Sequence, residues 1–163
     1  MSASRETAKL VLREATPADA PALAALFTAS VHVLASAYYT PEQLAAWAPQ
    51  LPDIAGWRER LGALRTIVAE VAEEPAGFIA YAADGHIELL FVAPEHARRG
   101  LASRLYADVE EALAACGVSE LRTEASEAAR AFFAGRGFVV VEAQEAARGG
   151  QRLRRYAMRK RIA

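Results

Sequence analysis

The sequence IELLFVAPEHARRGLASRLY, residues 87–106, decides the fold of this chain. Its first residues form a short apolar run that carries one carboxylate, a pattern typical of a buried strand. Pro94 ends this run, and a basic turn that contains Gly100 leads into an amphipathic helix. This order predicts a strand that leads into a helix through a loop. The backbone amides at the start of such a helix can bind phosphate.

The composition predicts one soluble domain over residues 1–163, with its core at about residues 9–161. Of the 163 residues 53% are hydrophobic, and the formal net charge is -1. This balanced charge argues against nucleic acid or a membrane as a partner. The single cysteine argues against a disulfide and a cysteine-rich metal site, so we expect no metal and a cytoplasmic location. The first 15 residues lack the apolar core of a signal peptide, and no apolar run approaches the ~20 residues of a membrane span.

Hydrophobic patterns and turn signals predict the elements that precede the central helix. Strands are expected at residues 9–13, 65–71, 76–82 and 86–92. The last three form an antiparallel meander, with a turn at residues 73–75 and a hairpin turn at Asp84 and Gly85. N-cap and capping-box signals at Thr16 and Thr40 predict helices, which are expected at residues 17–35, 41–47 and within 51–61.

The second half of the chain completes a mixed sheet. A helix at residues 100–116 has an apolar stripe that ends in Cys116, which we expect to be a small core residue. A strand at residues 120–125 follows, and it is parallel to the strand at residues 86–92 because the helix forms the crossover. Ser126 is expected to cap a short helix at residues 127–134.

Two closing strands are expected at residues 138–142 and 152–158, joined by a turn at Gly149 and Gly150. The arginines between Arg148 and Arg161 suggest an anionic partner or, as strand alternation favours, a solvated edge strand that discourages aggregation. The predicted fold class is therefore α+β. It has a central mixed, mostly antiparallel sheet flanked by helices.

The loop after Pro94 carries a motif that resembles a family signature. Residues 92–94 are VAP and residues 97–102 are ARRGLA. Gly100 allows close approach of the backbone to a diphosphate, although a glycine at a helix start beside arginines is more often part of a plain loop. The order of motifs resembles the GNAT family of acyl-CoA-dependent N-acetyltransferases, whose signature is V-x-P followed by [QR]-x-x-G-x-[GA]. Ala97 departs from its first position.

A second block strengthens this resemblance. Residues 126–138, SEAARAFFAGRGF, are similar to the family's N-x-x-A-x-x-F-Y-x-x-x-G-F. Ser126 replaces the usual asparagine, and Phe133 replaces the tyrosine that usually helps the thiolate to leave. Residues 40–49, TPEQLAAWAP, are similar to an uncharacterised bacterial branch of the family.

The resemblance implies a GNAT-like sheet that is splayed between its two parallel strands, with acetyl-CoA in the gap. The pantetheine would pair with the backbone like an added strand, and a backbone N–H near Phe91 or Val92 would polarise the thioester carbonyl. The cofactor-binding residues that the resemblance implies are Leu90, Phe91, Val92, Arg98, Arg99, Gly100, Leu101, Ala102, Ser103, Ser126 and Phe133.

Amide formation requires a base, because an alkyl amine has a pKa of about 10. His86 and Glu88 lie on one face of the predicted strand by its period of two, and the resemblance places the base or its water relay at these positions. Glu88 stands in an otherwise apolar run, where desolvation would make it a stronger base. The alternative is that Glu88 is a charge on a solvated strand face and His86 a turn residue.

Phe133 has no proton to give to the departing thiolate. Three explanations stay open: the thiolate leaves unaided, another group serves, or catalysis is lost. The candidate hydroxyls are Ser126, Tyr106 and Tyr156. For the acceptor pocket, the turn between the first two helices favours Tyr38 and Tyr39, whereas core packing is favoured for Trp47.

The sequence thus predicts an acetyl-CoA-dependent N-acetyltransferase that passes an acetyl group to a primary amine by direct attack on the thioester. A catalytically silent acyl-CoA-binding or regulatory module is the alternative. The acceptor is a small-molecule or peptide amine, and a homodimer stays open because relatives often dimerise.

Overall fold

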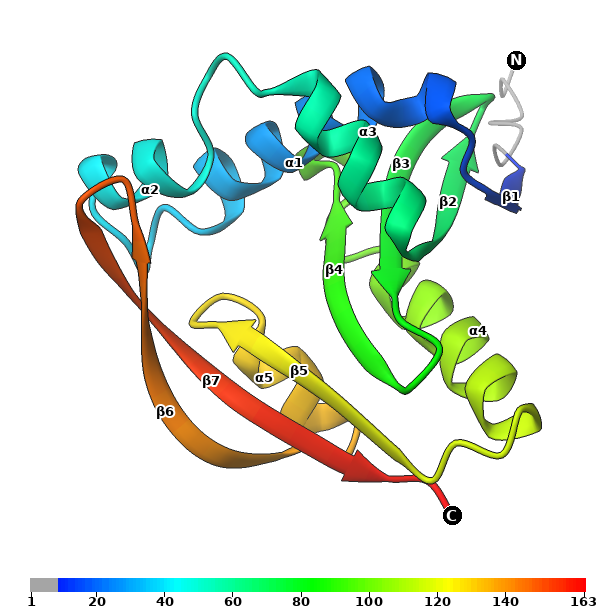
Figure 1. Cartoon of the computed structure of the whole chain (residues 1–163). Helices are drawn as coiled ribbons and strands as arrows, with labels where there is room; N and C mark the ends of the chain where they lie inside the picture. The colour runs from blue at the N-terminus through cyan, green and yellow to red at the C-terminus, as the bar shows by residue number, and fades with distance from the viewer. Residues whose placement is uncertain (1–8) are drawn as a thin grey trace, which may run out of the picture.

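The computed structural model describes residues 9–163, which form one seven-stranded sheet with helices on both faces (Figure 1). The strands are β1 Leu10–Glu14, β2 Arg65–Val71, β3 Glu74–Tyr81, β4 His86–Val92, β5 Glu120–Ser126, β6 Val139–Arg148 and β7 Gln151–Arg161. The helices are α1 Ala20–Leu34, α2 Pro41–Trp47, α3 Ile54–Ala63, α4 Leu101–Ala115 and α5 Arg130–Gly135, with 3-10 helices η1 Pro17–Asp19 and η2 Pro94–His96. The part of the signal-peptide prediction that concerns residues 1–8 lies outside the described residues.

The sheet has the order β1-β2-β3-β4-β5-β7-β6, which confirms the predicted mixed α+β fold. Strands β1 to β4 form an antiparallel meander, and β5, β7 and β6 are antiparallel to one another. The parallel pairing of β4 with β5 has only two residue pairs, His86 with Arg122 and Ile87 with Thr123. Beyond these pairs the two strands diverge, as Figure 1 shows.

Two apolar layers hold the helices against the sheet. Helices α1, α2 and α3 cover one face, and α4 and α5 cover the other (Figure 1). Because alternate residues of a strand point to opposite faces, Phe78 packs in the first layer and its neighbour Ile79 in the second.

The run Pro17–Leu34 is long and apolar enough to cross a membrane, by length and composition alone. Its buried residues, such as Leu23, belong to the first core layer, and this position explains its composition.

Several element boundaries differ from the sequence-based prediction, most of them by one or two residues, and the differences in the second half of the sheet are the largest. The turn between β2 and β3 is at Ala72 and Glu73, both with positive φ, so Glu74 already belongs to β3. Helix α5 begins at Arg130, because Ser126 Oγ accepts from the backbone N–H of Ala129 at 3.2 Å and caps a turn. Strands β6 and β7 are longer than predicted, since their mutual pairing continues through charged residues.

Two further predictions are wrong, one about the burial of a cysteine and one about the position of a strand in the sheet. Cys116 is exposed, because it lies at the C-cap where α4 ends and not within its buried stripe. The arginine-rich strand β7 is not an edge strand, because it pairs with β5 and with β6.

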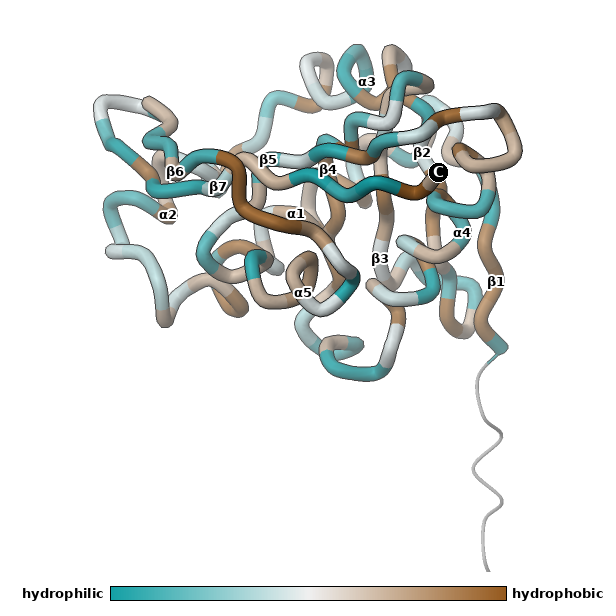
Figure 2. Tube along the Cα trace, turned by 90° about the horizontal axis from the view of Figure 1, so that it is seen from below, coloured by the Kyte–Doolittle hydropathy of each residue, from teal (hydrophilic) through white to brown (hydrophobic). Residues whose placement is uncertain are grey.

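The edge strand next to β7 is β6, and it begins with an exposed apolar segment. Val139, Val140 and Val141 are 59%, 43% and 57% exposed. They form a hydrophobic stretch in Figure 2. The pairing with β7 shifts between Val140 and Glu142, so Val141 is the extra residue of a β-bulge.

An ion pair fastens β1 to the start of the first helical segment. The Arg13 guanidinium donates to both carboxylate oxygens of Asp19, at 2.7 and 2.8 Å, and also bonds to Glu70. The hydrogen bond from Arg13 holds the pKa of Asp19 below its ordinary value of 3.8. Asp19 therefore stabilises the fold above about pH 4, and this contribution is lost as the pH falls through its folded-state pKa.

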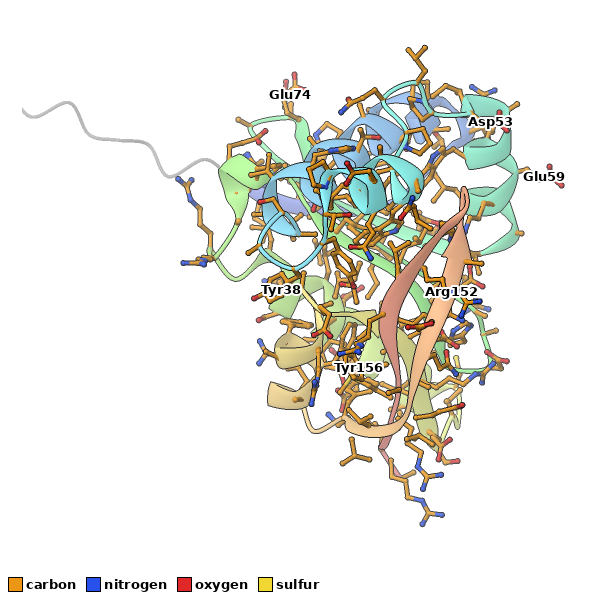
Figure 3. The ribbon with its side chains drawn as sticks, turned by 90° about the vertical axis from the view of Figure 1, so that its left-hand side faces the viewer. Tyr38, Asp53, Glu59, Glu74, Arg152 and Tyr156 are labelled. Atoms are coloured by element: carbon orange, nitrogen blue, oxygen red, sulfur yellow. The ribbon has the colours of Figure 1, made fainter. Side chains whose placement is uncertain are left out.

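We predict that Asp19→Asn lowers the free energy of unfolding by about 1–2 kcal/mol at pH 7, because a bidentate charged hydrogen bond is lost. The deficit should shrink towards pH 3. Urea unfolding at both pH values measures it, with Glu59→Gln, an exposed position (Figure 3), as the control. An equal deficit at pH 7 and pH 3 would contradict the role assigned to the ionised carboxylate.

Candidate active site

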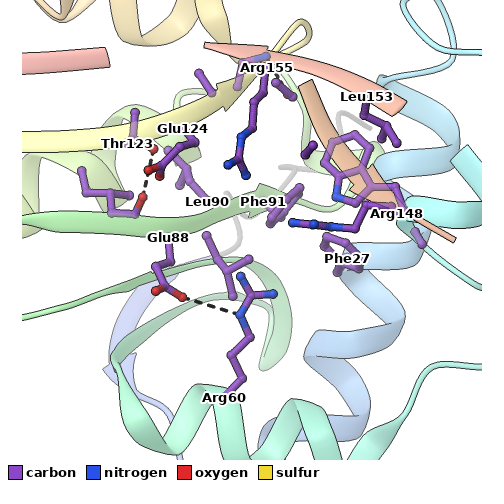
Figure 4. Close-up of a pocket in the computed structure, with 18 of the residues that line it drawn as sticks. Phe27, Arg60, Glu88, Leu90, Phe91, Thr123, Glu124, Arg148, Leu153 and Arg155 are labelled. Carbon is purple, nitrogen blue, oxygen red and sulfur yellow. Dashed lines mark hydrogen bonds and ion pairs between the residues drawn. The ribbon is translucent and has the colours of Figure 1, made fainter. Parts of the chain in front are cut away.

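A cavity of about 640 Å³ lies where β4 and β5 diverge (Figure 4). Residues of both strands form one part of its wall, and α1, α2, α3 and the β6–β7 hairpin supply the rest. The cavity exists because the backbone ladder between β4 and β5 ends at Ile87 and Thr123. The Thr123 hydroxyl donates to the Ile87 carbonyl at 2.9 Å and closes this last pair.

A chain of charged groups crosses the gap between the two strands. His86 Nε2 lies 2.5 Å from Glu124 Oε2, and its Nδ1 lies 3.8 Å from Glu88 Oε1. Glu88 Oε2 lies 3.6 Å from Arg60 Nε of α3 (Figure 4). The carboxylate of Glu124 fixes the orientation of the imidazole ring, so the Nδ1 side faces Glu88. The structure thus brings together the two residues that the sequence proposed as base and adds two that it missed.

Glu88 does not lie in the apolar surroundings that its sequence neighbours suggested. Its side chain is 30% exposed and pairs with Arg60. A β-bulge explains this, because the register of β3 with β4 shifts between Ala80 and Tyr81 and leaves Glu88 without a partner on β3. Its neighbours Ile87 and Leu89 are buried in opposite core layers. The desolvation argument for its strength as a base therefore does not hold.

Aromatic side chains line the cavity next to this charged chain. Phe27 packs against Trp57 and Phe91, with ring centroids 4.8 Å apart in each pair. Trp47 packs edge-on against Phe91 at 6.3 Å and also lines the cavity, so it combines the core role predicted for it with a place in the wall. These rings make this part of the site apolar.

The two neighbouring tyrosines have different positions. The Tyr39 hydroxyl donates to the Arg154 carbonyl at 2.7 Å and accepts from the Glu127 N–H at 2.9 Å. Burial raises the pKa of Tyr39, so it stays protonated. Tyr38 is 56% exposed and lies outside the cavity wall (Figure 3).

The start of α4 has the free backbone groups expected of an anion site. Gly100 is its N-cap, with φ 82°, and no side chain accepts from the first turn. The first intrahelical bond runs from the Arg104 N–H to the Gly100 carbonyl, so the amides of residues 101–103 precede the helical ladder. Arg98 also has a positive φ, 61°, which is uncommon for a residue with a side chain.

Of the hydroxyl groups considered as proton donors, one faces the cavity. Ser126 lines it. Tyr106 instead bonds to Glu110 on α4, with its pKa raised by burial, and Tyr156 donates to Glu127 at 2.6 Å. Phe133 is buried and lines the cavity with its ring.

The structure places the predicted site residues in two regions that β4 connects. The residues in the cavity wall are His86, Glu88, Leu90, Phe91, Ser126, Phe133 and Tyr39. Those outside it are Tyr38, Val92, Arg98, Arg99, Gly100, Leu101, Ala102 and Ser103. The wall also has Arg60 and Glu124, which the sequence analysis missed, and Arg148 and Arg155, for which it favoured a solvated edge. Trp57, an aromatic residue of the first helical region, lines it as well. Within residues 9–163 no group of three or more His, Cys, Asp or Glu side chains could hold a metal ion.

Comparisons with known proteins agree with this geometry. A family model described as an acetyltransferase (GNAT) domain matches residues 35–160. The uncharacterized N-acetyltransferase YafP of Escherichia coli is 40% identical over 94 residues, which cover 58% of this chain and 61% of that protein. The matched region thus spans less than two thirds of YafP.

Solved structures with the same fold include a GCN5-related N-acetyltransferase from Rhodopseudomonas palustris, described as "Aminotransferase, Class-II". It is 31% identical, with a TM-score of 0.91, over 98% of this chain and 100% of that chain. The PaiA N-acetyltransferase from Thermoplasma acidophilum, solved in complex with coenzyme A, is 18% identical with a TM-score of 0.70, over 94% and 99% of the two chains. At that identity the second likeness concerns the fold alone.

We predict that Tyr39→Phe lowers the free energy of unfolding by about 1–3 kcal/mol, because it leaves the Arg154 carbonyl and the Glu127 N–H without their partner. Denaturant unfolding measures the change. Tyr38→Phe is the matched control and should unfold like the unmodified protein. Equal stability of both variants would show that the Tyr39 hydroxyl does not hold these segments together.

Proposed function

The chain belongs to the GNAT family of N-acetyltransferases, and we propose that it transfers the acetyl group of acetyl-CoA to a primary amine. GNAT acetyltransferases use acetyl-CoA as their donor. The observation that carries the proposal is the gap between β4 and β5, with the His86–Glu124 pair on its wall. It is the site where a thioester and an attacking amine could meet beside a base.

The cofactor is proposed to follow β4 from the start of α4 to the cavity. Its diphosphate would accept hydrogen bonds from the amides of residues 101–103, at the positive end of the helix dipole. Arg98 and Arg99 add positive charge in the preceding loop. The pantetheine arm would lie along residues 88–92, which continue past the last pairing of β4 with β5.

In the proposed reaction, the amine nitrogen attacks the thioester carbonyl directly. His86 takes the amine proton, directly or through water, while Glu124 holds the ring and the negative charge of Glu88 attracts the ammonium form of the acceptor. A backbone N–H near Phe91 or Val92 stabilises the oxyanion. The C–S bond then breaks, and the electron pair leaves with the sulfur of coenzyme A.

The departing thiolate does not receive a proton from Phe133. A thiol has a pKa of about 8.5, so it leaves as a thiolate at moderate cost. Ser126 is the hydroxyl in the cavity wall that could protonate it. Because loss of a general acid costs about 10²–10⁴ in rate, phenylalanine at position 133 in place of the tyrosine of the family motif is compatible with a slow enzyme.

A catalytically silent acyl-CoA-binding module is the second candidate, favoured by Phe133 and Ala97. The two candidates share acetyl-CoA binding and differ in transfer. For the enzyme, the proposal includes a small-molecule or peptide amine as acceptor and a cytoplasmic location. Whether the chain forms a homodimer is a question for sedimentation measurements.

We predict that acetyl-CoA at 100-fold excess over its Kd raises the melting temperature by about 5–10 °C, since a ligand of the native state stabilises it by mass action. Ala102→Glu should remove most of this shift, because a carboxylate would repel the diphosphate. Ala107→Glu, on the exposed face of the same helix, should retain it. No shift in the unmodified protein would refute the assignment of the cofactor.

We also predict that His86→Gln lowers kcat/KM for amine acetylation by about 10²–10⁴, the usual contribution of a general base. Glu124→Gln should lower kcat/KM less than His86→Gln does, because the glutamine amide can still hydrogen-bond the His86 imidazole. It should also alter the pH profile of kcat/KM, because the amide carries no charge. Coenzyme A release with a broad amine panel measures both, and Glu120→Gln on β5 is the control.

Full activity of His86→Gln would remove the base assignment and leave the family unaffected. Binding of acetyl-CoA without transfer to any amine would favour the silent module.

A further inference from the structure

The β6–β7 hairpin contributes three arginines to the cavity wall, Arg148, Arg154 and Arg155, and two of them share a face of the hairpin. The Cα partners across the hairpin are Gln144 with Arg155, Ala146 with Leu153, and Arg148 with Gln151. Because alternate residues share a face, Arg148 and Arg155 lie on the same side as the buried Ala146 and Leu153, which also line the cavity. Figure 4 shows both guanidinium groups directed into the cavity.

Neither arginine has a carboxylate partner within the described residues. Arg155 Nε donates to Gln144 Oε1 at 3.0 Å, which orients the side chain, and Arg148 Nη1 donates to the Ala147 carbonyl at 3.0 Å. Throughout residues 9–163, no carboxylate oxygen lies within 4.0 Å of either guanidinium. Their remaining N–H groups are therefore available to a bound anion, and a planar fork of donors suits carboxylate or phosphate.

The other side of the cavity carries two carboxylates and one cation, Arg60, which pairs with Glu88. Glu88 and Glu124 flank His86 there, and Figure 4 shows these carboxylates apart from Arg148, with Phe91 between. Such a cavity matches a molecule with an ammonium at one end and an anion at the other. The ammonium would approach the carboxylates and the base, and the anion would reach the hairpin.

The two arginines are separate from the region proposed for the cofactor diphosphate. None of residues 94–103 lines the cavity, whereas Arg148 and Arg155 do. Their place in the sheet is also fixed independently of the α4 loop, because Tyr39 bonds to the carbonyl of Arg154, the neighbour of Arg155. The anion that they bind is thus expected to belong to the acceptor.

We propose that the acceptor is a small primary amine that also carries an anionic group, a carboxylate or a phosphate, and that Arg148 and Arg155 bind this group. The inference rests on the proposed function, because it names the acceptor class for the same cavity. It makes the arginine pair the specificity determinant and His86 the base. When the arginines bind the anionic group, the length of the acceptor would place its amine nitrogen near His86.

The test compares matched acceptors with acetyl-CoA as donor. Amino acids are assayed beside their decarboxylated amines and beside their aminophosphonate analogues. We expect the unmodified protein to acetylate the anionic members with at least about 10-fold higher kcat/KM. The carboxylate and phosphonate series show which anion fits.

Arg155→Gln and Arg148→Gln should each lower kcat/KM for anionic acceptors by about 10- to 100-fold, since a charged hydrogen bond is lost. They should leave the neutral amines and the KM for acetyl-CoA unchanged. Arg152→Gln is the control, because this arginine is on β7 but pairs with Glu145 outside the cavity. Equal loss for neutral and anionic acceptors, or a raised KM for acetyl-CoA alone, would overturn the proposal.

Binding measurements separate this inference from the proposed function. If neutral amines are acetylated as well as their anionic parents, the acceptor class is wrong and the transferase function stands. If no amine is acetylated, yet amino acids raise the melting temperature of the coenzyme A complex and Arg155→Gln removes the effect, the anion site stands and the transferase function fails. Absence of both transfer and stabilisation by any anionic amine overturns the inference.

Discussion

The short parallel contact between β4 and β5 is the constraint on which the rest of the structure depends. Two residue pairs and one threonine hydroxyl join the two parts of the sheet, together with the side-chain pairs His86–Glu124 and Asp84–Arg122. A longer ladder would fill the gap with backbone hydrogen bonds and leave no room for a ligand. A shorter one would remove the register that places Glu124 beside His86. The site therefore exists because pairing begins and then stops.

Elements far apart in the sequence stabilise this opening. The Tyr39 hydroxyl, which follows α1, bonds to the backbone beside the end of β5 and to β7. Phe27 of α1 and Trp47 of α2 pack on Phe91 of β4, and Trp57 of α3 packs on Phe27 and on Phe78 of β3. The wall of the cavity is thus part of the hydrophobic core, so its shape is held by the same contacts that stabilise the fold.

Local signals in the sequence predicted most of the fold. The strands at residues 65–71 and 86–92 have the predicted bounds, and so does the helix at residues 41–47 with its capping box. These succeeded because periodicity, caps and turns act over a few residues. The predictions for Cys116 and β7 failed because a residue at a helix end and a strand's place in the sheet depend on what packs beside them.

The site was predictable only in part for the same reason. Alternation along one strand pointed to His86 and Glu88 together. The structure does bring them close, but a β-bulge at Glu88 interrupts that alternation, and the bulge depends on the pairing of β4 with β3. Glu124 lies 38 positions beyond His86 in the sequence, and its proximity depends on the register of two parallel strands. For the arginines of the hairpin the sequence favoured a solvated edge over an anionic partner, because it does not reveal that their strands line the cavity wall.

The bulge at Val141 has a consequence for the protein in concentrated solution. Three exposed valines at a sheet edge are the type of surface on which strands of separate molecules pair and precipitate. The extra residue interrupts the even row of backbone donors and acceptors that such pairing requires, and it twists the strand locally. The chain can therefore carry apolar side chains at this edge without offering a continuous template for aggregation.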